Sequence, residues 1–185
     1  MVGTATSGET GVPFSFRNAT SSDIEVIVAI EGAVFGSSAW SRETVRREIV
    51  ADRADYLVAE VSGADFTPVT IIGYGGILVS SGGRSADVQT ITVVESWRRK
   101  GLGRALITTL LSRAVERGAR EVFLEVRADN PHAQALYRSL GFEQVRVRRI
   151  FSGPVAIDVV VMRLLLDECM SALARSWLNT SKGGA

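Results

Sequence analysis

The spacing of apolar residues predicts helices and then strands in the first half of the chain. A short strand is expected over residues 14–17, followed by the polar cluster Thr20–Asp23, which can cap a helix. Apolar residues then recur at helical spacing as far as Phe35, and Ser41 can cap a second helix. Three apolar segments joined by short turns follow, over 56–61, 70–79 and 86–94, which predicts an antiparallel meander.

Strands alternate with helices in the second half. An apolar stripe from Leu102 to Ala114 predicts a helix that Gly118 ends, and a strand over 121–126 leads into a helix that Asn130 can cap. A strand, a crossover helix and a further strand favour a parallel pair. Two closing strands are expected over 145–151 and 155–166. The fold class is therefore α/β, with a mixed, mostly antiparallel sheet and about four helices.

Composition limits the choice of partners and compartment. With 185 residues and 46% hydrophobic residues, the chain suits one domain, over 14–166, between a flexible leader over 1–13 and a tail helix over 167–185. Twenty-one basic and 20 acidic residues do not favour nucleic acid or an anionic membrane. The single cysteine, Cys169, excludes an internal disulfide and fits the cytoplasm. No apolar segment reaches the ~18 residues of a membrane span.

The first chemical signal is the Gly-x-Gly at the start of the long helix. Gly101 and Gly103 follow directly on a strand and on the basic residues Arg98 and Arg99. The unpaired N–H groups of a helix start suit a pyrophosphate, although the same pattern occurs in a plain strand-to-helix turn. The third glycine of a dinucleotide fingerprint and the Lys-Ser/Thr of a P-loop are both missing.

Two side chains could carry acid–base chemistry. Glu125 alternates with apolar neighbours on its strand, so it is either paired with a nearby arginine or placed at a cleft, where partial burial would raise its pKa. Tyr137 lies on the short helix, either as a core residue or as a general acid. His132 is expected at the surface, and Cys169 lacks neighbours that would activate a thiolate.

Taken in order, these motifs resemble the GNAT superfamily of acetyltransferases. The resemblance covers 14–166 in layout and rests on Ile91-Thr92-Val93, Arg98-x-x-Gly101-x-Gly103, Leu124-Glu125-Val126-Arg127, Asn130 and Ala135-Leu136-Tyr137-x-x-Leu140-Gly141-Phe142. Within the superfamily it is closest to the RimI type, which acetylates the N-terminal alanine of a small-subunit ribosomal protein. The resemblance implies a sheet splayed at its parallel strand pair.

The resemblance also implies the chemistry and the site residues. Acetyl-CoA would be the co-substrate, with no metal, and an amine would attack the thioester directly. Glu125 would be the general base and Tyr137 the acid that protonates the departing thiolate. The cofactor would be bound by two strand residues, the glycine loop and the cap residue: Ile91, Val93, Arg98, Arg99, Lys100, Gly101, Leu102, Gly103, Arg104 and Asn130.

The acceptor regions depart from the RimI pattern. After Arg148-Arg149 the family usually has two tyrosines, where this chain has Ile150-Phe151-Ser152, and the loop over 35–41 is longer than the family's Phe-Pro-Trp-Ser. The implied acceptor residues are Phe35, Trp40, Arg149 and Phe151. We expect the acceptor to be the N-terminal α-amine of a protein, such as a ribosomal protein. We expect the enzyme to be a monomer or a weak dimer. The alternatives are a lysine, polyamine or small amine, and a non-catalytic acyl-CoA-binding module.

Overall fold

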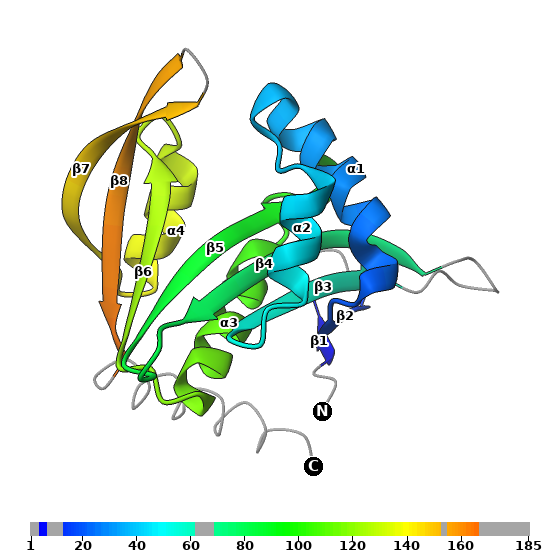
Figure 1. The fold of residues 1–185 in the computed structure, drawn as a ribbon, viewed down its shortest axis with the longest axis horizontal. Helices are drawn as coiled ribbons and strands as arrows, with labels where there is room; N and C mark the ends of the chain where they lie inside the picture. The colour runs from blue at the N-terminus through cyan, green and yellow to red at the C-terminus, as the bar shows by residue number, and fades with distance from the viewer. Residues whose placement is uncertain (1–3, 7–12, 62–68, 153–154, 167–185) are drawn as a thin grey trace. The chain divides into compact units, whose positions relative to one another are not determined.

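The computed structural model describes residues 4–6, 13–61, 69–152 and 155–166. Short 3-10 turns lie at Ser21–Asp23, Gly36–Ser38 and Glu95–Trp97. The longer elements, drawn in Figure 1, are β1 (Thr4–Thr6), β2 (Pro13–Asn18), α1 (Ile24–Phe35), α2 (Arg42–Ile49), β3 (Ala54–Val61), β4 (Thr70–Val79), β5 (Ser85–Val93), α3 (Leu102–Glu116), β6 (Glu121–Arg127), α4 (Pro131–Ser139), β7 (Glu143–Ser152) and β8 (Val155–Leu165).

The predicted mixed α/β architecture is confirmed. The strand order is β1-β2-β3-β4-β5-β6-β8-β7. Pairing is antiparallel from β1 to β4, and again between β6 and β8 and between β8 and β7. The neighbours β5 and β6 are connected through α3, which is the crossover that a parallel pair requires. The four α-helices expected from the sequence are all present among the described residues.

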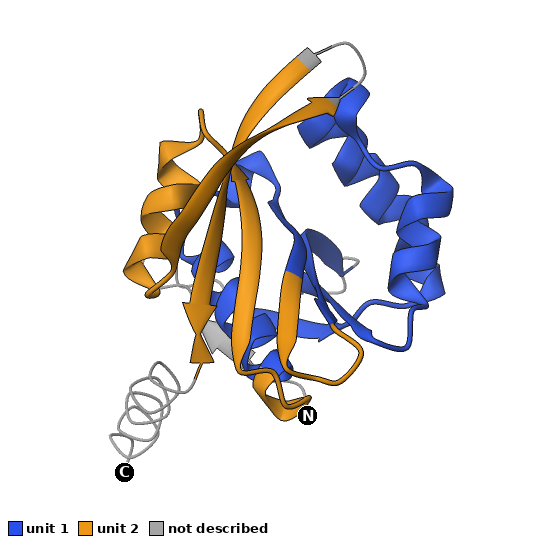
Figure 2. Cartoon of the chain, turned by 60° about the vertical axis from the view of Figure 1, so that its left-hand side comes forward, with its two compact units in different colours: residues 1–79, 88–114 blue, residues 80–87, 115–185 orange. Residues whose placement is uncertain are grey.

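Two compact units make up the chain (Figure 2). Unit 1 comprises residues 1–79 and 88–114, and unit 2 comprises residues 80–87 and 115–185. Strand β5 contributes to both, because Ser85–Asp87 belongs to unit 2 and Val88–Val93 to unit 1. Each unit has its own sheet segment and its own helices.

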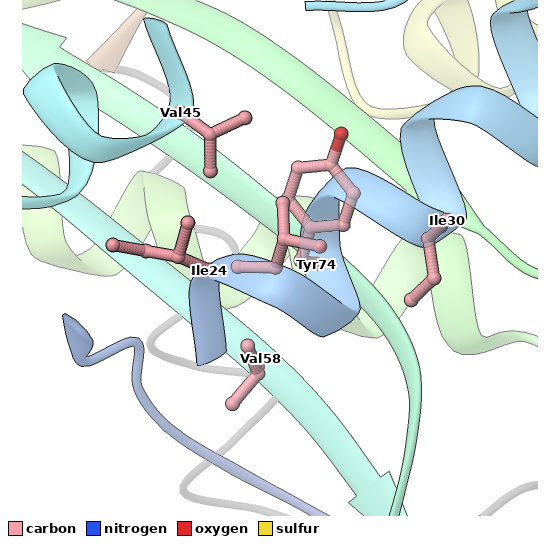
Figure 3. Close-up of a cluster of buried hydrophobic side chains, with 6 residues drawn as sticks. Ile24, Ile30, Val45, Val58 and Tyr74 are labelled. Carbon is pink, nitrogen blue, oxygen red and sulfur yellow. The ribbon is translucent and has the colours of Figure 1, made fainter. Parts of the chain in front are cut away.

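Helices cover both faces of the unit 1 sheet. On one face the Tyr74 ring stands among apolar side chains of α1, α2 and β3 (Figure 3), in a cluster whose buried members are Ile24, Ile27, Ile30, Val45, Val58 and Tyr74. On the other face Leu102 and Leu110 of α3 lie against Gly73 and Gly75 of β4. Alternate residues of a strand point to opposite faces, so β4 presents a large ring to one layer and bare backbone to the other.

The glycines of β4 mark close approaches to neighbouring elements. A Cβ atom on Gly73 would lie 2.8 Å from the Thr92 carbonyl oxygen, and one on Gly75 would lie 2.9 Å from Ile91 Cδ1. On the opposite face, a Cβ atom on Gly76 would lie 2.3 Å from the Tyr56 ring. Any side chain at these positions would push β5, α3 or Tyr56 away from the strand.

In unit 2, β6, β8 and β7 form an antiparallel segment with α4 on one side (Figure 2). Val122, Leu124 and Val126 are buried and alternate with exposed Glu125 and Arg127, which confirms the predicted alternation. Leu164 of β8 lies on the buried face and approaches the C-terminal end of α4, because its Cδ1 is 3.3 Å from the Cβ position of Gly141. Glu125 therefore faces away from α4.

Most predicted helix boundaries agree with the structure. The N-caps were placed correctly, since Ser41 Oγ accepts from the Thr44 N–H at 3.2 Å and Asn130 Oδ1 accepts from the Ala133 N–H at 3.1 Å. Gly118 and Gly141 adopt positive φ angles of 88° and 91° just beyond α3 and α4, where a left-handed residue commonly ends a helix.

The two chain ends lie largely outside the described residues. The leader predicted over 1–13 is described at Thr4–Thr6 and Pro13, where the chain forms strand β1 and the first residue of β2, which pair with each other. The rest of the predicted leader lies outside the described residues, and its flexibility stays a prediction. The predicted tail helix and Cys169 lie beyond the last described residue, Leu166.

Candidate functional site

The loop from Arg98 to Arg104 has an unusual backbone in unit 1. Arg99 has a positive φ of 61°, and Gly101 has a φ of 83°. Helix α3 begins at Leu102, and its first helical hydrogen bond runs from the Ala105 N–H to the Gly101 carbonyl at 3.0 Å. A non-glycine residue with positive φ is uncommon, so the loop holds a conformation that local preference alone does not favour.

This loop can bind an anion. The first four N–H groups of a helix lack helical partners, and the helix dipole adds partial positive charge at the same end. Exposed Arg98, Arg99 and Arg104 add full charges, while Lys100 lies over the Trp97 ring at 5.3 Å from its centroid. Leu102 is fully buried and anchors the helix start. Helix dipole, backbone donors and side-chain charge all favour a phosphate group here.

The strand that leads into this loop carries Ile91 and Val93. Both are half-buried and alternate with Thr92, which is 2% exposed. The Arg98 Nε–H donates to the Val93 carbonyl oxygen at 3.2 Å, so the loop is tied back to the strand that precedes it. Unit 1 therefore brings together every residue predicted to bind the cofactor except Asn130.

Glu125 is exposed and ion-paired in unit 2. The Arg148 Nε–H donates to Glu125 Oε1 at 2.9 Å and the Nη2–H donates to Oε2 at 2.8 Å. The Glu125 side chain is 40% exposed. Of the two alternatives that the sequence left open for Glu125, the pairing with an arginine is present, and the placement at a cleft stays a prediction. For the pairing, the sequence predicted an arginine near Glu125 along the chain. The partner is Arg148, and Arg127 pairs with Asp129 instead.

A second carboxylate, which the sequence analysis missed, lies near Glu125. Asp87 of β5 belongs to unit 2 and has buried Ala86 as its neighbour. Although much of the Asp87 residue is exposed, partial burial of its carboxyl and the negative charge of Glu125 raise its pKa. The sequence could have indicated Asp87. Like Glu125, it is a carboxylate on a strand of the predicted parallel pair.

Tyr137 is buried on α4. It is 8% exposed, and its ring packs edge-on against Phe142 with centroids 5.8 Å apart. Burial raises the pKa of the Tyr137 hydroxyl to about 12, so the phenol is protonated at neutral pH. Asn130 caps the same helix through Oδ1, which supports the structural role that the sequence also allowed. His132 is exposed, as expected.

The predicted acceptor residues divide between the two units. In unit 1, Phe35 is 41% exposed at the end of α1, whereas Trp40 is half-buried and packs on the core cluster. In unit 2, Arg149 pairs with Asp158 at 2.8 Å, and Phe151 is 74% exposed on β7. The large exposed ring of Phe151 is an apolar surface on the last strand of the sheet order.

Comparisons with known proteins identify the family of the chain. The model of the Acetyltransferase (GNAT) family matches residues 26–142. N-alpha-acetyltransferase RimI of Mycobacterium tuberculosis is 35% identical over 156 residues, which cover 82% of this chain and 92% of that protein. The predicted resemblance to RimI-type enzymes is confirmed by this similarity.

Solved structures give the same result. The ribosomal-protein-S18-alanine N-acetyltransferase of Escherichia coli superposes with a TM-score of 0.68 at 26% identity, covering 82% of this chain and 93% of that one. Arabidopsis thaliana NAA60 in complex with acetyl-CoA shares the fold, with a TM-score of 0.73 at 21% identity over 83% and 99% of the two chains. The chain belongs to the GNAT family and is an N-acetyltransferase that takes its acetyl group from acetyl-CoA.

Proposed function

We propose that this enzyme acetylates the N-terminal α-amine of a protein, with alanine as the preferred first residue. The observation that carries the proposal is the 35% identity to the M. tuberculosis N-alpha-acetyltransferase RimI across most of both chains. The chemistry agrees with it. An α-amine has a pKa of ~7.7–8.0 against ~10.4 for lysine, so deprotonating it costs roughly 3.5 kcal/mol less.

The cofactor half of the proposed site is the Arg98–Arg104 loop with the strand before it. Backbone N–H groups of the loop bind the pyrophosphate of acetyl-CoA, and exposed Arg98, Arg99 and Arg104 add charge. Ile91 and Val93 align the pantetheine arm along β5, and Asn130 contacts it. The positive φ angles at Arg99 and Gly101 support this assignment, because they turn the loop directly into the helix start.

The proposed base is Glu125, acting on the amine directly or through a water molecule. The neutral amine attacks the thioester carbonyl carbon, so that a C–N bond forms as a tetrahedral intermediate and the amine proton passes to the carboxylate. The C–S bond then breaks, CoA leaves as the thiolate, the amide is released, and the protonated Glu125 returns its proton to solvent. Arg148 uses one lone pair on each Glu125 oxygen, so the carboxylate retains capacity to accept that proton.

Tyr137 is the proposed acid. Its raised pKa of about 12 keeps the hydroxyl protonated throughout the neutral range, so it can donate to the departing sulfur at any working pH. An ordinary thiol has a pKa of ~8.5. The phenol therefore acts mainly by donating a hydrogen bond to the developing thiolate. This thiolate leaves the site as free CoA.

A second candidate is acetylation of a small amine such as a polyamine. It is favoured by Ile150-Phe151-Ser152, which lacks the phenol hydroxyls of the two tyrosines usual in RimI-type enzymes. Phe151 instead presents an exposed apolar ring. Such a surface binds a peptide less specifically, because it offers no hydrogen-bond donor to the peptide backbone.

The deciding experiment is acetylation of a peptide library that varies at its first residue, compared with free lysine, spermidine and small primary amines. Mass spectrometry identifies the acetylated nitrogen. We expect kcat/KM for Ala-starting peptides to exceed that for free amines by at least ~100-fold. Turnover of free amines alone would overturn the proposal in favour of the second candidate.

A further inference from the structure

Glu31 is a buried carboxylate that takes no part in the chemistry proposed above. It lies on α1, one helical turn before Phe35, and is 2% exposed. Burial raises the pKa of its carboxyl, and the hydrogen bond from the Trp40 N–H acts in the opposite direction. A buried carboxyl group is costly unless its oxygens are hydrogen-bonded, so the identity of its partners indicates what it stabilises.

Its two oxygens are bonded to different parts of unit 1. The Trp40 backbone N–H donates to Oε2 at 2.8 Å, and the Tyr74 hydroxyl makes a short hydrogen bond to Oε1. Tyr74 is 1% exposed at the centre of the core cluster shown in Figure 3. Glu31 thus connects the backbone of the α1–α2 loop to the rigid core of the unit.

The α1–α2 loop, residues 36–41, consists of the 3-10 turn Gly36–Ser38 and the three residues that lead to the cap of α2. Gly36 turns out of α1 with a φ of 55°, and the Ala39 N–H bonds back within the loop to the Gly36 carbonyl at 3.2 Å. The Glu31–Trp40 bond reaches across the loop at its far end, just before Ser41 caps α2. Losing it would leave a buried polar partner unpaired and free the loop to change shape.

We propose that Glu31 is a positioning residue for the acceptor amine. It fixes the α1–α2 loop from beneath and so sets where Phe35 and Trp40 stand. The proposal rests on the proposed function and on the expectation from the family resemblance that these two residues contact the acceptor and not the cofactor. A carboxyl that served only core stability would not discriminate between the two substrates.

Four variants separate the possibilities. Glu31→Leu removes both bonds, and Glu31→Gln can keep both if its carbonyl faces Trp40 and its amide faces Tyr74. Tyr74→Phe removes one donor to Glu31. Tyr56→Phe is the matched control, because Tyr56 is also buried and close enough for the Glu31 charge to affect its pKa, yet its hydroxyl has no hydrogen-bond partner among the described residues.

The measurements are KM for an Ala-starting peptide, KM for acetyl-CoA, and backbone hydrogen exchange over residues 36–41. We expect Glu31→Leu to raise the peptide KM about tenfold and to speed loop exchange, with the acetyl-CoA KM within twofold of wild type. Tyr74→Phe should shift the same quantities less, Glu31→Gln should restore them, and Tyr56→Phe should leave them unchanged. If Glu31→Leu does not fold, Tyr74→Phe carries the test.

Unchanged loop exchange, or equal rises in both KM values, would overturn the positioning role. Failure of the proposed function is distinguishable from this. If the wild type acetylates a small amine and no peptide, the same KM comparison is made with that amine, and the exchange measurement needs no substrate at all.

Discussion

Arg148 of β7 reaches across β8 to hold both oxygens of the Glu125 carboxylate on β6. Val161 of β8 stands between the two strands, paired with Glu125 on one side and with Arg146 on the other. Contact with Glu125 raises the pKa of Arg148, which therefore stays charged. Because a bidentate guanidinium fixes the plane of a carboxylate, Arg148 orients the proposed base without occupying all of its lone pairs.

We predict that Arg148 contributes to catalysis only through Glu125. Glu125→Gln should lower kcat by about 10²–10⁴, the usual contribution of a general base. Arg148→Ala should lower kcat about tenfold by loosening the carboxylate, and the double variant should be no worse than Glu125→Gln. Steady-state kinetics of the three proteins with a saturating acceptor check this prediction.

Arg127→Ala is the matched control for Arg148→Ala. Arg127 lies on the same strand as Glu125. It makes a similar bidentate pair, but with Asp129 and not with Glu125. We expect its kcat to stay within twofold of wild type. Additive losses in the Glu125→Gln, Arg148→Ala double variant would show that Arg148 acts on the substrate independently of Glu125.

The backbone of the pyrophosphate loop gives a second prediction. A Cβ atom on Gly101 would meet no atom within 4 Å, so the cost of Gly101→Ala lies in its φ of 83° and not in a clash. An L-residue with such a φ costs roughly 1–2 kcal/mol. The loop should relax away from this conformation, raising the KM for acetyl-CoA about 5–10-fold and leaving the acceptor KM unchanged.

Gly82→Ala separates backbone strain from cofactor binding. Gly82 lies in the turn between β4 and β5, has a φ of 101°, and also has no atom within 4 Å of its Cβ position. The substitution should lower stability by a similar amount without altering the acetyl-CoA KM. An equal change of KM in both variants would mean that the effect at Gly101 is general destabilisation.

Local signals were sufficient to predict most of the fold. The caps at Ser41 and Asn130 and the helix end at Gly118 were predicted correctly, because each depends on a few adjacent residues. Strand ends differ by one or two residues, since a ladder extends as far as its partner strand allows.

Contacts between residues far apart in the sequence could not be predicted in the same way. Glu125 and Arg148 are separated by 23 residues, and Glu31 and Tyr74 by 43. No periodic pattern identifies which arginine will pair with a strand carboxylate, nor that a glutamate near the end of α1 points inward. The sequence left two alternatives open for Glu125, a pairing with an arginine and a place at a cleft, for the same reason, because both depend on residues distant in the sequence.

Tyr137 allows a test of the proposed acid with little disturbance of packing. Tyr137→Phe keeps the edge-on ring contact with Phe142 and removes only the hydroxyl. We expect kcat to fall about 10²–10³ while acetyl-CoA binding, measured by calorimetry, stays within twofold of wild type. Phe142→Leu is the packing control. It should lower the melting temperature and change kcat little. A Tyr137→Phe enzyme with full kcat would exclude the phenol from the reaction.

A buried ion pair in unit 1 makes stability depend on pH. Asp23 is 4% exposed and accepts from Arg17 Nη1 and Nη2 at 2.7 and 2.8 Å. The Arg17 hydrogen bonds lower the pKa of Asp23 below its ordinary value, outweighing the opposing effect of burial. The Thr20 backbone N–H donates to the same carboxylate at 2.7 Å, which adds to the lowering.

The pKa of Asp23 in the folded state lies below the unfolded value of ~3.9. The ionised carboxylate therefore stabilises the folded protein fully above about pH 4, and this contribution is lost as the pH falls through the folded pKa. Asp23→Asn should lower the free energy of unfolding by roughly 1–3 kcal/mol at pH 7. Measured by urea denaturation, the difference in unfolding free energy between the variant and wild type should become smaller below pH 4. Asp129→Asn, at an exposed pair with Arg127, should differ little from wild type at any pH. A gap at Asp23 that stays constant from pH 7 to pH 3 would contradict the linkage, because it would mean that the carboxylate contributes no pH-dependent stabilisation.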